Sequence, residues 1–151
     1  MASYYSTRTA YNSFLVNTVP VTNDYRVSKT QTGTTFLIDA SVADDPLTSL
    51  DIELPSPDHA GMYFKFVFIT QSERQVNIKL IDNTDSFVGL VVRHVTSGNH
   101  GVRVAAGSPW DRMEFSTAAR PGSWIEIVST GTQWVVHGHH FGGSMDFRND
   151  T

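Results

Sequence analysis

The sequence contains no cysteine. This single absence excludes a disulfide framework, a thiolate metal site and a cysteine nucleophile. A chain of 151 residues needs no such cross-links, because a domain of that size buries roughly two-thirds of the surface that its unfolded form exposes. The length fits a single domain within the usual range of ~100–200 residues.

Basic residues are also scarce. The 11 lysines and arginines face 15 aspartates and glutamates, for a net charge of −4, and the only lysines are Lys29, Lys65 and Lys79. Proteins that bind nucleic acid through its phosphates usually concentrate positive charge on one face. We therefore expect no direct contact with nucleic acid.

Long apolar segments are missing as well. No run approaches the ~20 apolar residues that a membrane-spanning helix needs, and residues 1–8 lack the apolar stretch of a secretory signal. We expect the protein to be made in a cytoplasm and not to enter a membrane by itself. It could still leave the cell as part of a larger particle.

Helical periodicity is nearly absent, whereas strand signals are frequent. Residues 50–54 alternate apolar and acidic side chains, which is typical of a half-buried strand, and Pro55 ends the run. Residues 62–69 place Met62, Phe64, Phe66 and Phe68 on one face, which we expect to lie in the core. Seven to nine short strands separated by turns predict an all-β protein, a single antiparallel sandwich or jelly-roll-like domain with little or no helix.

The clearest hairpin joins residues 124–128 to residues 133–137. Gly131 lies in the short loop between them, where a positive φ would be needed. Trp124 and Trp134 are on the two arms of this hairpin, and we expect their rings to pack as a cross-strand or diagonal pair.

The chain ends differ in composition from the middle. Residues 1–30 hold tyrosine, threonine and asparagine with little charge, and are interpreted as an N-terminal arm that packs on a neighbouring subunit or as an edge strand. Residues 31–140 form the predicted sandwich core. Residues 141–151 are predicted to be a flexible C-terminal tail, although they carry Phe141 and Phe147.

No local signature of catalysis is present in the sequence. We find no G-x-S-x-G elbow, no phosphate-binding loop and no G-x-G-x-x-G segment after a strand. We therefore assign no catalytic residue and expect a protein without enzymatic activity.

Three of the six histidines lie together in the segment His137-Gly138-His139-His140. Residues i and i+2 of a strand share a face, so His137 and His139 should point the same way. Imidazole suits transition metals, and a three-fold axis would bring six imidazoles together. His137 and His139 are the candidate metal ligands, and an exposed polar strand end without a metal is the alternative interpretation. No other cofactor is expected.

Two segments carry a resemblance to known proteins. Residues 50–66 read LDIELPSPDHAGMYFKF, and residues 121–136 read PGSWIEIVSTGTQWVV. In order and spacing they resemble the small β modules of virion proteins from tailed phages and large DNA viruses. The resemblance covers roughly residues 34–137.

The resemblance implies a viral structural protein, either a capsid decoration (cement) protein or a fibre or spike head for host attachment. Such a protein would be located in the virion and made in the host cytoplasm. Its partners would be further copies of the chain, expected as a homotrimer, and other capsid or virion proteins. The alternative is a carbohydrate-binding, lectin-like module that stacks a host glycan on exposed aromatic side chains such as Trp110.

Overall fold

The computed structural model describes residues 17–41, 49–82, 85–94 and 101–149, apart from the side chains of residues 106–109. In these ranges the regular structure is almost all strand, with one 3₁₀ turn at Lys29–Gln31 and no α-helix. The strands are β1 (Thr18–Val21), β2 (Tyr25–Arg26), β3 (Thr34–Ile38), β4 (Leu50–Leu54), β5 (Tyr63–Phe68), β6 (Val76–Leu80), β7 (Phe87–His94), β8 (Gly101–Trp110), β9 (Arg112–Phe115), β10 (Trp124–Ser129), β11 (Trp134–Phe141) and β12 (Met145–Arg148). The all-β prediction is confirmed.

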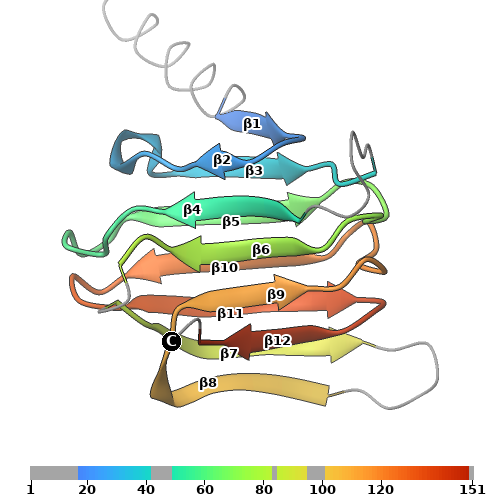
Figure 1. The fold of residues 1–151 in the computed structure, drawn as a ribbon. Coiled ribbons are helices and arrows are strands. Elements are labelled where there is room, and N and C mark those ends of the chain that lie inside the picture. The colour runs from blue at the N-terminus through green and yellow to red at the C-terminus, as the bar shows by residue number, and fades with distance from the viewer. Residues whose placement is uncertain (1–16, 42–48, 83–84, 95–100, 150–151) are drawn as a thin grey trace, which may run out of the picture.

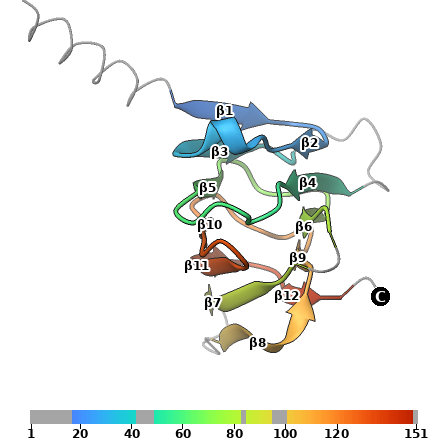
Figure 2. The same ribbon diagram turned by 90° about the vertical axis from the view of Figure 1, so that its left-hand side faces the viewer.

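The strands form two sheets that lie face to face, as Figures 1 and 2 show from two directions. The seven-stranded sheet has the order β1-β3-β5-β10-β11-β7-β8, and the five-stranded sheet has the order β12-β9-β6-β4-β2. The predicted sandwich is therefore confirmed. No helix in the described ranges is long and apolar enough to cross a membrane.

The direction of strand pairing differs from the prediction. From β1 to β6 the chain alternates between the sheets, and each strand enters beside the previous one of its own sheet. A chain that crosses to the other sheet and returns runs in its original direction, so β1, β3 and β5 are parallel, as are β2, β4 and β6. Antiparallel pairs follow later, for example β5–β10, β10–β11 and β6–β9. The expectation of antiparallel sheets is thus corrected: both sheets are mixed.

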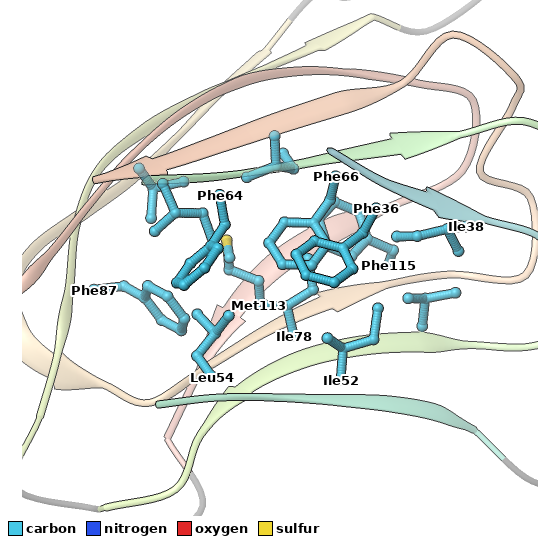
Figure 3. Close-up of a cluster of buried hydrophobic side chains, with 14 of the residues drawn as sticks. Phe36, Ile38, Ile52, Leu54, Phe64, Phe66, Ile78, Phe87, Met113 and Phe115 are labelled. Carbon is cyan, nitrogen blue, oxygen red and sulfur yellow. The ribbon is translucent and has the colours of Figure 1, made fainter. Parts of the chain in front are cut away.

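The core lies between the two sheets and follows from the alternation of the strands. Phe64, Phe66 and Phe68 on β5 are at most 1% exposed, as expected for that face. From the five-stranded sheet, residues such as Ile52 and Ile78 meet them (Figure 3). Burying each of these side chains contributes roughly 1.5–3 kcal/mol to stability.

The predicted hairpin is present, but its two tryptophans do not pair. Strands β10 and β11 are antiparallel, and Gly131 in their loop has a φ of 100°. In this register Trp124 lies opposite His139, and Trp134 lies opposite Ser129. Trp134 points into the core, whereas Trp124 is half-buried on the outer side of the sheet. The expected ring pair is therefore wrong, because the two residues occupy opposite ends and opposite faces of the hairpin.

The chain ends belong to the sandwich to a greater extent than their composition indicated. β1 is an edge strand of the seven-stranded sheet, and residues 1–16, which include most of the expected arm, lie outside the described residues. The expected tail contains β12, which pairs with β9 and buries Met145 and Phe147. Residues 141–151 were predicted to be a flexible tail, but the part up to Arg148 forms a turn and a paired strand of the sandwich.

Candidate functional site

The outer surfaces of the two sheets differ in chemistry. We call the outer side of the five-stranded sheet the charged face. Strand register places its charged and polar side chains in two adjacent rows, which comprise Arg26, Glu53, Lys79, Arg112 and Arg148 in one row and Asp51, Asn77, Glu114 and Asp146 in the other. Opposite charges pair between the rows, so this face is well suited to contact with water.

Asp51 accepts hydrogen bonds from three side chains of the charged face and its border. Its carboxylate accepts hydrogen bonds from Lys79 Nζ at 2.7 Å, Asn77 Nδ2 at 2.8 Å and Ser49 Oγ at 2.7 Å. Burial alone would raise the pKa of Asp51, but these three donors outweigh it and hold the pKa below its usual value. Asp51 is thus a structural anion whose partners are already within the chain.

We call the outer side of the seven-stranded sheet the apolar face. Among the described residues, seven large hydrophobic side chains are exposed, and five of them lie here: Leu90, Val102, Val104, Val128 and Val135. Register joins them across strands, with Val128 opposite Val135 and Leu90 opposite Val104. The other two, Ile69 and Ile81, directly follow the ends of β5 and β6. Contiguous exposed apolar surface of this kind marks an interaction site more often than scattered residues do.

Fixed charge on the apolar face is balanced within it. Among the described outward-facing residues of the seven-stranded sheet, the acidic and basic side chains are Glu126 and Lys65. Oε1 of Glu126 and Nζ of Lys65 form an ion pair at 3.0 Å. Burial raises the pKa of Glu126, but hydrogen bonds from Lys65 and Tyr63 outweigh it and lower the pKa overall. Lys65 Nζ also lies 5.2 Å from the ring centroid of Trp124, a cation–π distance. The face therefore carries no net fixed charge.

Three histidines lie within the apolar face, and we call His94, His137 and His139 the histidine cluster. His137 and His139 share the outer side of β11, as the sequence predicted. Trp124 touches both, with ring centroids 5.3 Å and 5.2 Å away. His94 on β7 joins them through a contact of 2.9 Å between its Nε2 and Nδ1 of His139. Sequence reasoning missed His94, because 45 residues separate it from His139 and a parallel strand pairing brings them together.

His140 does not belong to this cluster. It lies on the inner side of β11, fully buried, with its ring 5.5 Å from that of Phe115. Burial lowers the pKa of His140 to about 4, and the positive charge of Arg93 acts in the same direction. Neither ring nitrogen has a partner in hydrogen-bonding geometry, although the nearby Gly142 backbone slightly favours the charged form.

The predicted metal ligands are therefore adjacent on one face, but one chain does not bring them into a complete cage. Across the described residues, no three His, Cys, Asp or Glu side chains are grouped as a metal ion would require. The three-fold arrangement of His137 and His139 stays a prediction. Trp110, expected to be exposed for sugar stacking, is half-buried and packs against the core.

No protein-family model matches the sequence, and no curated protein matches it.

Proposed function

We propose that this chain is a viral structural protein that assembles as a homo-oligomer on the virion, with the apolar face as its subunit contact. The observation that carries the proposal is the difference between the two outer faces. One displays paired charges, and the other displays five exposed large hydrophobic side chains beside a neutral ion pair. Leaving the second face in water is unfavourable, at roughly 25 cal/mol for each Å² of apolar surface.

A second copy of the same chain is the partner that the apolar face fits best. In a symmetric dimer the same patch of each copy meets its counterpart, whereas in a ring one part of the patch meets a different part of it on the next copy. Lys65 and Glu126 neutralise each other on this face. Two such faces can therefore approach without the repulsion that a charged face would suffer.

The virion assignment rests on the resemblance of residues 50–66 and 121–136 to small virion β modules. The fold itself hosts many functions. A rigid sandwich with one hydrated face and one association face has the properties that a decoration protein or fibre head needs. A homotrimer remains the expected state.

The mass of the native assembly tests the proposal. Light scattering on the full chain at micromolar concentration should give a multiple of 16.7 kDa, three times that value for the trimer. Substituting Val102→Asp together with Val104→Asp should produce a folded monomer. The matched control is Ile81→Asp, because Ile81 is 43% exposed but lies outside the apolar face.

A clean monomer of the unsubstituted chain at all concentrations would contradict the assembly. So would an oligomer that survives the double substitution. Mass spectrometry of purified virus particles tests the virion assignment separately, since the chain should be recovered with the other particle proteins.

A carbohydrate-binding module is the second candidate, and Trp124 is the observation that favours it. Its half-buried ring on the apolar face is surrounded by Lys65, His137 and His139, which could donate hydrogen bonds beside a stacked sugar. A glycan-array signal that is lost in Trp124→Ala, from a chain that stays monomeric, would favour this function over the first.

A further inference from the structure

The ion pair of Lys65 and Glu126 lies at the centre of the apolar face. Strands β5 and β10, which carry it, are the third and fourth of the seven strands. Strand register places the pair in a row that crosses the whole sheet and contains Thr18, Thr35, Lys65, Glu126, His137, Leu90 and Val104. A mostly apolar row lies on one side of it, with Pro20, Leu37, Val67, Trp124, His139, Val92 and Val102. A shorter row on the other side contains Tyr63, Val128, Val135 and Val88. The two charges are therefore flanked by apolar and aromatic side chains.

These three rows are large enough for a contact between subunits. With ~4.8 Å between neighbouring strands and ~6.7 Å between successive residues on one face, the rows cover roughly 600 Å². Each partner in a stable protein interface contributes about 600–1,000 Å². An interface that uses the whole face therefore has the ion pair near its middle, where water is excluded, and not at its rim.

Within one chain the pair already has partners of the kind that burial requires. Oε1 of Glu126 accepts a hydrogen bond from Nζ of Lys65 at 3.0 Å, and the hydroxyl of Tyr63 donates to the same carboxylate. Nζ of Lys65 also lies 5.2 Å from the ring centroid of Trp124. Removing a charge from water is costly unless such contacts replace the water. In the single chain the two side chains are still 33% and 31% exposed, so they are accessible to a partner.

The pair also has hydrogen-bonding capacity that one chain does not use. A lysine ammonium has three N–H donors, and a carboxylate has about four acceptor positions. Lys65 donates to Glu126, and Glu126 accepts from Lys65 and Tyr63. A partner that matches this face must present an anion beside a cation, within an otherwise apolar surface. The same face of a second copy has this composition, and a symmetric contact brings opposite charges of two copies together.

We propose that the Lys65–Glu126 pair determines the register of the contact between copies, and that Lys65 of each copy donates to Glu126 of a neighbouring copy. This inference rests on the proposed assembly through the apolar face. Valine and leucine side chains alone allow two flat faces to meet in several alignments. Alignments that place either charge against apolar side chains are disfavoured, because that charge is then buried without a partner. The pair therefore selects one alignment.

The dissociation constant of the assembly, obtained by light scattering on a dilution series of the full chain, tests the proposal. Lys65→Met and Glu126→Gln should each weaken assembly at least about thirtyfold, because each leaves one buried charge unpaired. The double variant removes both charges and should assemble more tightly than either single variant. Lys79→Met is the matched control and should leave assembly unchanged, since Lys79 pairs with Asp51 on the charged face.

Circular dichroism on each variant verifies that the chain is folded. Unchanged assembly in both single variants overturns the proposal, because the pair then lies outside the buried contact. A double variant that assembles no better than the single variants also overturns it, since the loss is then not caused by an unpaired charge. Either result leaves the proposed assembly intact, provided that the unsubstituted chain assembles and the double substitution of Val102 and Val104 dissociates it. A monomeric unsubstituted chain overturns both proposals.

Discussion

Trp134 Nε1 donates a hydrogen bond to the main-chain carbonyl of Pro55, over 3.2 Å. This bond joins β11 of the seven-stranded sheet to the residue that follows β4 of the five-stranded sheet. The Trp134 ring is 0% exposed and lies 5.6 Å from the ring of Phe64. Trp134 thus links the two layers through its hydrogen bond to Pro55, and within its own sheet its ring packs against Phe64.

We predict that Trp134→Ala lowers the free energy of unfolding by about 3–5 kcal/mol, because it removes a large buried ring and leaves a cavity. For a domain of this size, each kcal/mol corresponds to a fall of about 2–4 °C in the thermal midpoint. Trp124→Ala is the matched comparison and should cost clearly less, since Trp124 is only half-buried. Equal midpoints for Trp134→Ala and the unsubstituted chain would show that the ring does not couple the sheets.

At Gly89 the backbone leaves no room for a side chain. Its φ is +128°, and a Cβ at this position would lie 2.1 Å from the carbonyl oxygen of Val136. We predict that Gly89→Ala destabilises the chain by at least about 1–3 kcal/mol from backbone strain alone, with the steric clash in addition. Gly101→Ala is the control, because nothing lies within 4 Å of its added Cβ. Urea titration of both variants measures the difference, and similar midpoints would contradict the prediction.

His140 should make stability depend on pH between about 6.5 and 4. Its pKa is about 4 in the folded chain against an ordinary value of 6.5, so the unfolded state binds more protons over that interval. The free energy of unfolding must then fall as the pH falls, by up to about 3 kcal/mol in total. Substituting His140→Leu should remove most of this slope, because leucine suits the apolar surroundings and does not titrate. Denaturant titrations of both proteins at pH 7 and 4.5 give the slopes, which would be equal if His140 were not responsible.

Asp51→Asn should lower stability at neutral pH by about 1.5–3 kcal/mol at most, the usual range for hydrogen bonds to a charged group. The effect is at the lower end of that range if solvent screens the pair, since the Asp51 side chain is 26% exposed. The folded-state pKa of Asp51 is lowered, so its contribution is present above the ordinary pKa and is lost as the pH falls through the folded value. Lys79→Met combined with Asp51→Asn completes a double-mutant cycle. A coupling energy near zero at pH 7 would show that the ion pair is not the source of the effect.

Several features of this protein follow from the sequence alone. The alternation of residues 50–54 and 62–69 determines which side chains face the core, because successive residues of a strand point to opposite sides. Phe64, Phe66 and Phe68 are buried accordingly. The hairpin around Gly131 is also local, since its turn and both strands lie within about twenty residues. The shared outward direction of His137 and His139 is a consequence of the same period of two.

Strand partners and outer faces, in contrast, were decided by the tertiary structure. Parallel and antiparallel strands show the same alternation of apolar and polar residues, and this alternation does not indicate which strands are neighbours. The parallel pairing within β1–β6 could therefore not be predicted from the sequence pattern. Trp124 and Trp134 were expected to meet, but the hairpin register assigns them to different faces. His94 meets His139 only because β7 lies beside β11, and their contact depends on that pairing. Local sequence sets the direction of each side chain relative to its own strand, whereas the neighbours of that side chain come from contacts between distant segments.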